Sequence, residues 1–308
     1  MVKGGGLLRF PAASRVRQLL RSGSYDIVHA NEAHAVTAAW LAMRRGGTGH
    51  TKFVISRRVG YPIGRGALAQ ARYRAAARIV AISKWSADRV MRSGIPAEKI
   101  TIVHEGVELP VMPDAERRAG ARARFGIGAD EALLGCIGVL SPDKGQEWLI
   151  RALPLVRREC PGAKLILAGD GPCRERLESL AGEMNLTEAV IFTGFVADVE
   201  TIYAALDVFL LPSMFEALSN ALMTAMAYGI ASIAFNSGGP AEIIDHEKSG
   251  LLVSGPNAEE IAGAILRVLR DPGLSARLRA GGRARIAERF SASKMVDAML
   301  SVYESVLA

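Results

Sequence analysis

Residues 211–229 read LPSMFEALSNALMTAMAYG, and most of the interpretation of this chain depends on them. An apolar strand ends at Pro212, a polar loop carries Glu216, and an Ala/Leu/Met helix follows and stops at a glycine. Ser219 or Asn220 is a natural N-cap for that helix, and glycine is common just past a helix end. The free amide groups of the first helical turn, together with the positive end of the helix dipole, predict an anion site beside Glu216.

Outward from this stretch, short apolar runs alternate with segments of helical length and period. Segments 146–159 and 173–185 show the helical period. Strands that alternate with helices predict βαβ units and parallel sheets, hence an α/β fold. The predicted strands are residues 26–29, 53–56, 78–82, 100–103, 133–138, 164–168, 190–192, 208–211 and 231–235.

A length of 308 residues is typical of two domains, and the charge divides in the same way. Residues 1–125 carry 22 Lys and Arg against 8 Asp and Glu, whereas residues 126–308 carry 16 against 23. Prolines and turn formers in residues 109–114 predict a boundary there. The tail from Glu259 onward shows helical patterns only, and the arginines of residues 267–289 are predicted to lie on a solvated helical face.

The composition excludes several classes of protein. Half of the residues are hydrophobic and 22% are charged, which is not the composition of a disordered chain. The longest apolar run, residues 133–140, is far shorter than the roughly 20 residues of a membrane-spanning helix, and no secretory signal is recognisable after Met1. The three cysteines lack the number and spacing of a disulfide framework or a zinc site, so a reduced, cytoplasmic location is expected.

The loops at the carboxyl ends of the strands are the candidate site, because ligands of open α/β sheets bind there. Residues 138–145, GVLSPDKG, place Lys144 where it can neutralise a phosphate, although an ordinary turn with a solvated lysine would read the same. Residues 168–172, AGDGP, are also typical of an ordinary turn. Residues 237–242, SGGPAE, add a second carboxylate, Glu242. Two carboxylates beside an anion site describe a nucleotide-sugar pocket, whereas the sequence contains no Walker A loop and no dinucleotide fingerprint.

Several of these segments occur together, in the same order and spacing, in one known family. They are D-I-V-H-A-N-E-A-H-A (26–35), I-V-A-I-S-K (79–84), K-I-T-I-V-H-E-G-V-E (99–108), G-V-L-S-P-D-K-G (138–145), A-G-D-G-P (168–172), F-T-G-F-V (192–196), the stretch 211–229, G-G-P-A-E-I-I (238–244) and S-G-L-L-V (249–253). Through them nearly the whole chain resembles the retaining glycosyltransferases of family 4, or glycosyl transferases group 1. The resemblance implies the GT-B fold, in which two Rossmann-like domains face each other across a cleft.

The resemblance also implies that one domain faces the acceptor and the other binds the donor. Residues 1–112, with a C-terminal helix of residues 293–308, would form the acceptor-side domain, and residues 113–292 the domain that binds the nucleotide-sugar donor. The family's first βαβ unit has no counterpart before Asp26, so the N-terminal domain is expected to be truncated.

By the same resemblance, four residues are candidate catalytic residues. Lys144 would neutralise the donor pyrophosphate, Glu216 would contact the transferred sugar, and His29 and His34 would lie near the reacting sugar, although a purely structural role is open for each histidine. The backbone of residues 218–220 would hold the distal phosphate. The candidate donor-binding residues are Gly138, Lys144, Gly194, Phe195, Val196, Glu216, Leu218, Ser219, Asn220, Thr224, Gly238, Gly239 and Glu242.

The implied reaction moves a sugar from a nucleoside-diphosphate sugar to a glycan or lipid-linked acceptor of the cell envelope, such as a lipopolysaccharide precursor. The acceptor hydroxyl would attack the face from which the nucleoside diphosphate leaves, so the anomeric configuration would be retained. No cofactor and no metal are expected, since the sequence has no D-x-D carboxylate pair and Lys144 with the helix N-terminus can stabilise the leaving group.

Three departures from the family pattern keep alternatives open. Thr224 stands where the family usually has a second glutamate that binds the donor ribose, Val139 where many members have an arginine, and Asn31 where a histidine is common. With the short N-terminal domain, they leave a non-catalytic relative, acting as a binding or partner module, as the main alternative. Another GT-B reaction such as nucleotide-sugar epimerisation is a third possibility, and nucleic-acid binding ranks last because the basic residues lack interleaved aromatic side chains.

The basic N-terminal domain predicts a peripheral location at the inner face of the membrane, because clustered arginines attract anionic lipid. The arginines that motivate this expectation are Arg44, Arg45, Arg57, Arg58, Arg65, Arg72, Arg74 and Arg78.

Overall fold

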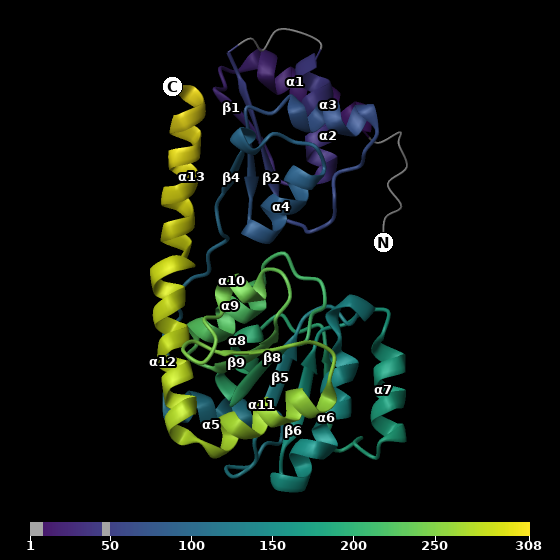
Figure 1. The fold of residues 1–308 in the computed structure, drawn as a ribbon, viewed down its shortest axis with the longest axis vertical. Helices are drawn as coiled ribbons and strands as arrows, with labels where there is room; N and C mark the ends of the chain where they lie inside the picture. The colour runs from purple at the N-terminus through teal and green to yellow at the C-terminus, as the bar shows by residue number, and fades with distance from the viewer. Residues whose placement is uncertain (1–8, 45–49) are drawn as a thin grey trace. The chain divides into compact units, whose positions relative to one another are not determined.

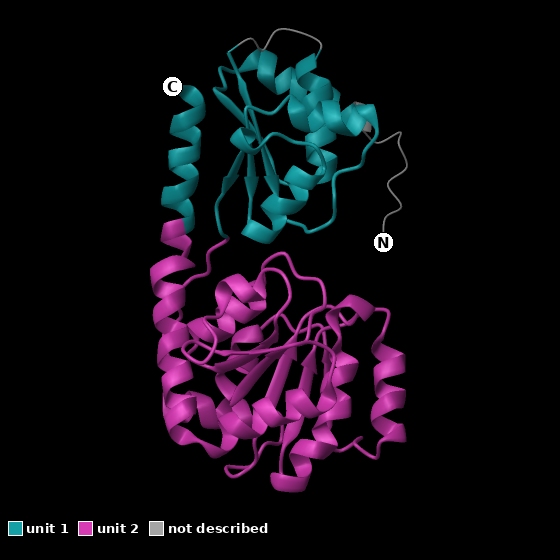
Figure 2. Ribbon diagram, in the orientation of Figure 1, with its two compact units in different colours: residues 1–104, 295–308 teal, residues 105–294 magenta. Residues whose placement is uncertain are grey.

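The computed structural model describes residues 9–44 and 50–308, and the chain divides into two compact units (Figures 1 and 2). Unit 1 comprises Met1–His104 and Met295–Ala308, and unit 2 comprises Glu105–Lys294. Each unit contains one parallel β-sheet with helices packed on it, which confirms the predicted α/β class.

Unit 1 has a four-stranded parallel sheet in the order β1-β2-β3-β4. In β2, Ile55 faces a core that includes Trp40 of α2, whereas its neighbour Val54 packs with Val302 of α13 (Ala292–Leu307) on the other side. Successive strand residues point to opposite faces, so a strand covered on both faces has apolar residues side by side, as β2 has at residues 53–55. The other elements are α1 (Arg9–Ser22), β1 (Ile27–Ala30), α2 (Ala33–Arg44), β2 (Lys52–Arg57), α3 (Ala67–Arg74), β3 (Arg78–Ala81), α4 (Lys84–Arg92), the 3-10 helix η2 (Ala97–Lys99) and β4 (Ile100–Ile102).

Unit 2 has a six-stranded parallel sheet in the order β10-β9-β8-β5-β6-β7. The chain proceeds from β5 to β6 and β7 on one side and returns to β8, β9 and β10 on the other, so the order reverses between β5 and β8. The elements are α5 (Ala115–Arg124), β5 (Leu133–Ile137), η3 (Pro142–Lys144), α6 (Gln146–Glu159), β6 (Lys164–Ala168), α7 (Arg174–Glu183), β7 (Val190–Gly194), α8 (Val199–Ala205), β8 (Val208–Leu211), α9 (Asn220–Ala227), β9 (Ala231–Phe235), α10 (Pro240–Ile243), β10 (Leu251–Val253), α11 (Ala258–Arg270) and α12 (Pro272–Arg289). Ligands of such sheets bind at the reversal, outside the carboxyl ends of the strands.

All nine predicted strands are present, and the tail from Ala258 is helical as predicted. Strands 164–168, 208–211 and 231–235 have the predicted bounds, and the others differ by one or two residues at an end. The sequence did not predict β10, because a run of three residues is too short to show a period.

Two predictions about arginine side chains are wrong. Arg57, assigned to an exposed basic surface, is only 8% exposed and donates a hydrogen bond to the Tyr61 carbonyl. Arg283 and Arg285 of α12, assigned to a solvated face, are half-buried and donate to backbone carbonyls. Arg45 lies outside the described residues. Arg283 and Arg285 satisfy carbonyl groups that are distant in sequence, which no local pattern reveals, whereas the carbonyl that Arg57 satisfies belongs to the loop directly after its own strand.

Within the described part of the chain, none of the helices combines the length and the apolar character that a membrane span requires. The three cysteines are free, and burial raises the pKa of the Cys136 thiol to about 12. Cys136 in β5 is therefore a neutral core side chain.

Candidate functional site

The carboxyl ends of the strands of unit 2 carry loops that are joined to one another by backbone hydrogen bonds. The Gly138 amide after β5 donates to the Ala168 carbonyl of β6 at 2.9 Å, and the Met214 amide after β8 donates to the Asp143 carbonyl at 2.9 Å. The Gly239 amide after β9 donates to the carbonyl of Glu216 at 2.9 Å, which links a third loop. These bonds bring the separate glycine-rich segments of the sequence into one surface.

Two of the glycines are required by the closeness of these loops. Gly145 has a φ of +67°, and a Cβ there would lie 2.3 Å from the Pro212 carbonyl oxygen. A Cβ on Gly239 would lie 2.2 Å from the carbonyl oxygen of Ala217. Any larger residue would push the loops after β5 and β9 away from the loop after β8, so the glycines permit the close approach.

Lys144 and Glu216 form an ion pair at the point where the strand order reverses. The Lys144 Nζ lies 2.5 Å from Glu216 Oε2, and the two side chains are 26% and 14% exposed. Lys144 comes from the loop after β5 and Glu216 from the loop after β8, which are neighbouring strands. A cation that can bind phosphate and a carboxylate that can accept sugar hydroxyls therefore lie side by side.

The first turn of α9 begins just after Glu216. The hydroxyl of Ser219 is the N-cap and accepts a hydrogen bond from the Leu222 amide at 3.3 Å. The amides of Asn220 and Ala221, in the same turn, have no partner within the helix because an α-helix leaves its first amides unbonded. With the positive end of the helix dipole, these amides can bind an anion next to Lys144.

Thr224 lies one turn further along α9 and is partly exposed. Burial raises the pKa of the neighbouring Tyr203 hydroxyl, while a hydrogen bond with Thr224 acts in the opposite direction. The Tyr203 ring also stacks on Tyr228 with their centroids 5.3 Å apart. At the position where the resemblance implies a carboxylate, this chain therefore has the hydroxyl of Thr224, next to the neutral hydroxyl of Tyr203.

The remaining predicted donor-binding residues lie in the same set of loops. Gly194 ends β7, and Phe195 after it is 85% exposed, with Val196 partly buried. Leu218 is buried beneath the start of α9, Gly238 lies in the loop after β9, and Glu242 belongs to α10. The structure thus gathers the residues assigned to the donor on one edge of the unit 2 sheet, and their roles in binding stay predictions.

His29 and His34 lie in unit 1. The Nδ1 of His29 is 2.7 Å from the Tyr303 hydroxyl, and its Nε2 is 2.7 Å from the Ser56 hydroxyl. Burial lowers the pKa of His29, so the neutral ring is favoured. His34, in the first turn of α2, is exposed. Both ring nitrogens of His29 are thus engaged in joining β1 to β2 and α13, and the catalytic assignment of the two histidines stays a prediction.

Sequence reasoning missed two polar residues that support the site. Gln146 is 2% exposed, and its side-chain amide donates to the Val139 carbonyl at 2.9 Å. The Ser237 hydroxyl donates to the Ser213 carbonyl at 2.7 Å, across two neighbouring loops. For Gln146, the sequence offers one signal of such a role, a polar residue directly after the glycine that precedes a helix.

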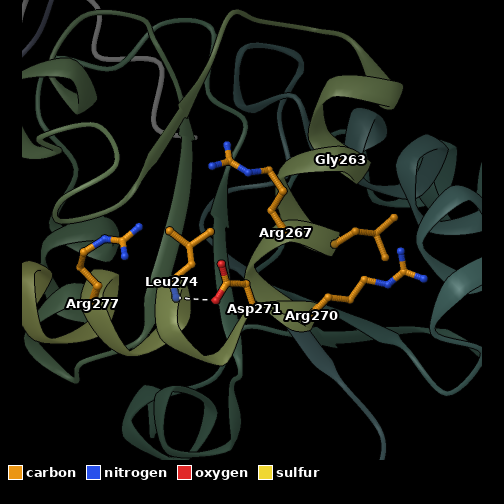
Figure 3. A pocket seen from close by; sticks show the side chains of 7 residues that line it. Gly263, Arg267, Arg270, Asp271, Leu274 and Arg277 are labelled. Atoms are coloured by element: carbon orange, nitrogen blue, oxygen red, sulfur yellow. Dashed lines mark hydrogen bonds between the residues drawn. The ribbon is translucent and has the colours of Figure 1, made fainter.

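One pocket of unit 2 lies away from this edge (Figure 3). It is lined by the turn between α11 and α12, where Arg267, Arg270 and Arg277 point in different directions. Arg267 pairs with Glu247 at 2.7 Å, and Arg270 pairs with Glu159. Since these guanidinium groups diverge and two of them already have carboxylate partners, the pocket is not a site for one anion.

Comparisons with known proteins agree with this architecture. Residues 131–271 match the family described as "Glycosyl transferases group 1", and residues 2–110 match "Glycosyltransferase Family 4". The chain belongs to the group 1 glycosyltransferases of the family 4 type. Its two parallel-sheet units are the two Rossmann-like domains of the GT-B fold.

Individual relatives differ in the part of this chain that they match, and the chain spans less than two thirds of several of them. A GDP-mannose-dependent alpha-(1-6)-phosphatidylinositol monomannoside mannosyltransferase of Mycobacterium tuberculosis is 32% identical over 230 residues, 70% of this chain and 60% of the relative. A D-inositol 3-phosphate glycosyltransferase of Saccharomonospora viridis is 29% identical over 96% of this chain and 73% of its own length. The crystal structure of Anabaena HepE in complex with UDP and glucose has a TM-score of 0.86 at 23% identity, covering 98% of this chain and 83% of that one.

Proposed function

We propose that this chain transfers a sugar from a nucleoside-diphosphate sugar to a glycan or lipid-linked acceptor, with retention of the anomeric configuration and without a metal ion. The observation that carries the proposal is the Lys144–Glu216 pair, 2.5 Å apart, next to the open amides of the first turn of α9. Cation, carboxylate and helix terminus together match a diphosphate that is joined to a sugar.

In the proposed reaction, the oxygen of an acceptor hydroxyl forms a bond to the anomeric carbon. The bond between that carbon and the β-phosphate oxygen breaks on the same face, and the hydroxyl proton passes to the departing phosphate oxygen. Lys144 and the Asn220 and Ala221 amides stabilise the charge that develops on the nucleoside diphosphate. Glu216 orients the sugar by accepting hydrogen bonds from its hydroxyl groups.

The names of the relatives support this class of substrate. The mycobacterial relative is named for GDP-mannose and a phosphatidylinositol mannoside, and the Anabaena structure contains UDP and glucose. A rhizobial relative, 35% identical over 61% of this chain, is named a lipopolysaccharide core biosynthesis glycosyltransferase. These names include two nucleotide bases and several acceptors. We therefore propose a nucleoside-diphosphate sugar as the donor and an envelope glycan or glycolipid as the acceptor, and the nucleotide base is identified by experiment.

The test is incubation of the purified chain with UDP-, GDP- and ADP-sugars, a panel of inositol and lipopolysaccharide-core acceptors, and excess chelator. We expect nucleoside diphosphate release from one donor only, faster with the correct acceptor, and an NMR spectrum of the product with the anomeric configuration of the donor. Inverted product, or turnover that stops with chelator and returns with a divalent cation, would contradict the mechanism. Donor binding without any turnover would favour the non-catalytic alternative.

We also propose that unit 1 holds the chain at the cytoplasmic face of an anionic membrane. Arg44, Arg58, Arg65 and Arg74 are exposed, whereas Arg72 and Arg78 are partly buried and donate to Thr37 and to the Glu98 carbonyl. Exposed arginines near anionic lipid contribute about 1 kcal/mol each. Sedimentation with phosphatidylglycerol vesicles should be lost in high salt and after the four exposed arginines are changed to Glu. Binding that is indifferent to both changes would contradict this location.

A further inference from the structure

Helix α12 packs closely against the helix whose amino end forms the anion site. Two glycines let α12 approach the backbone before β10: a Cβ on Gly281 would lie 2.1 Å from the Lys248 carbonyl oxygen, and one on Gly282 would lie 3.0 Å from that of Ser249. A Cβ on Gly282 would also be in van der Waals contact with Met226 Cβ of α9, at 3.6 Å. Helix α12 is also in contact with both α9 and β9. The arginines of α12 therefore reach the backbone at the carboxyl end of α9.

In the last turn of α9, one backbone carbonyl accepts no hydrogen bond from a backbone amide and is available to an arginine side chain. The Ile230 amide donates to the Ala225 carbonyl at 3.0 Å and the Gly229 amide to the Met226 carbonyl at 2.9 Å, with Gly229 at a φ of +62°. This is the Schellman arrangement, which satisfies the preceding carbonyls but not that of the last helical residue. The last residue is Ala227, and its carbonyl accepts a hydrogen bond from Arg283.

The Arg283 guanidinium also bonds the segment of residues 110–112, and two other arginines of α12 bond further segments. Arg283 also donates to the Pro110 carbonyl at 3.2 Å and contacts the Met112 sulfur at 3.0 Å. Arg279 donates to the Gly229 carbonyl at 2.8 Å. Arg285 donates to the carbonyls of Ile243 and, at 3.0 Å, Glu242, which both belong to α10. The side chains that hold the carboxyl end of α9 and the helix α10 thus come from one helix.

We propose that Arg283 is a positioning residue for the donor phosphates: by fixing the Ala227 carbonyl to α12 and to residues 110–112, it places the first turn of α9 next to Lys144. The inference rests on the proposed function, because it assigns the phosphates to that turn. Helix α9 has eight residues and is therefore about 12 Å long, short enough for its two ends to move as one rigid body. Binding groups need placement within about 0.5 Å, so a loosened carboxyl end changes the amide positions at the other end.

The variants that test this are Arg283→Gln, which removes the charge and most donors, and Arg283→Lys, which keeps the charge but not the fork of donors. The matched control is Arg118→Gln. Arg118 donates to the Ala204 and Leu206 carbonyls at 3.1 and 3.0 Å and to Asp207 at 2.6 Å, directly before β8 at the amino edge of the sheet, where its guanidinium holds no carbonyl of α9. Arg283→Gln and Arg118→Gln each lose a guanidinium that satisfies carbonyl groups, so each is expected to lower the melting temperature.

Two measurements separate positioning from general stability. One is calorimetric affinity for UDP, GDP and ADP, and the other is hydrogen exchange of residues 220–229 in the protein without nucleotide. We expect Arg283→Gln to weaken nucleotide binding about tenfold and to speed exchange across α9, Arg283→Lys to recover part of both, and Arg118→Gln to leave both unchanged.

Equal affinity in Arg283→Gln and the unsubstituted chain would overturn the inference, whatever happens to the melting temperature. Failure of the unsubstituted chain to bind any nucleotide would overturn the donor assignment. In that case hydrogen exchange alone decides whether Arg283 positions α9: faster exchange in Arg283→Gln but not in Arg118→Gln supports it, and equal exchange in the two variants overturns it.

Discussion

The carboxyl edges of the two sheets use polar side chains in opposite ways. In unit 2, Lys144 and Glu216 meet as charges of opposite sign and remain partly exposed. In unit 1, the ring of His29 lies between the hydroxyls of Tyr303 and Ser56, and burial favours its neutral form. Both edges follow parallel strands, so the topology alone does not distinguish them.

The difference teaches what to expect from each edge. An ion pair of modest exposure can exchange one partner for a charged ligand, because each ion keeps lone pairs or protons free for a new hydrogen bond. A neutral imidazole has only two hydrogen-bonding atoms, and both are used in unit 1. The unit 2 edge therefore has the chemistry of a ligand site, whereas the His29 cluster, defined as His29, Ser56 and Tyr303, attaches α13 to the sheet.

The largest expected effect comes from breaking the unit 2 pair with Glu216→Gln. Turnover should fall at least about a hundredfold, because the amide cannot provide the charge that orients the sugar in the transition state. Nucleoside diphosphate affinity should stay equal or increase, since Lys144 no longer has a competing carboxylate. Steady-state kinetics and calorimetry measure the two effects.

The matched control for that variant is Glu131→Gln. Glu131 pairs with Lys164 at 3.0 Å near the starts of β5 and β6, and hydrogen bonding to the Gly128 amide and to Lys164 lowers its pKa. Removing this pair should leave turnover unchanged. A comparable loss of turnover in both variants would mean that the Lys144–Glu216 pair has no special role.

A smaller effect is expected when a carboxylate is restored in α9 with Thr224→Glu. A new hydrogen bond to the donor ribose is worth about 1 kcal/mol, or about fivefold in affinity for the nucleotide. Thr224→Val, which keeps the shape and removes the hydroxyl, should change affinity by less than about twofold. Weaker binding in Thr224→Glu would show that Tyr203 and its neighbours have adapted the site to a neutral residue.

The smallest effect on the donor site is expected from the His29 cluster. Tyr303→Phe should lower the free energy of unfolding by about 1 kcal/mol and leave nucleotide affinity unchanged. Because burial lowers the pKa of folded His29 below its ordinary 6.5, the unfolded chain binds the proton more readily. Stability should therefore decrease as the pH falls from about 6.5 toward the folded pKa, and His29→Gln should reduce that dependence.

Chemical denaturation at several pH values between 5 and 8 measures this dependence. A stability profile that is the same with and without His29 would contradict the structural role. A large loss of turnover in Tyr303→Phe, with stability unchanged, would instead place the cluster in the reaction.

The sequence predicted the parts of the donor edge that local chemistry specifies. Strands of apolar residues, glycines at the strand ends, and an N-cap before an Ala/Leu/Met run are short-range signals, and the structure has β8, the loop and α9 as expected. Lys144 and Glu216 were predicted for the site because each lies in a loop after a recognisable strand and because the family resemblance assigns both to the donor. Their contact at 2.5 Å follows once β5 and β8 are neighbours.

Side chains that act over long sequence separations could not be predicted in this way. Arg283 is 56 residues from Ala227, and Ser237 is 24 residues from Ser213, so their partners depend on tertiary packing. An arginine-rich helix also satisfies the pattern of a solvated face, which is why Arg283 and Arg285 were assigned to solvent. For His29, the sequence left a structural role open beside the catalytic one, and only the position of Tyr303, 274 residues away, shows how its ring is held.

Calorimetric titration with UDP, GDP and ADP, without added metal, tests the central claim most directly when it is done on the unsubstituted chain, Lys144→Ala and Lys164→Ala. A hydrogen bond to a charged group is worth about 1.5–3 kcal/mol, so Lys144→Ala should weaken binding about 10- to 100-fold. Lys164→Ala, which loses a lysine from the ion pair with Glu131 at the amino edge of the same sheet, should bind as the unsubstituted chain does. One nucleotide bound, with affinity dependent on Lys144 only, is the predicted result. No binding of any nucleotide, or equal affinity in all three proteins, would contradict a donor site at this edge.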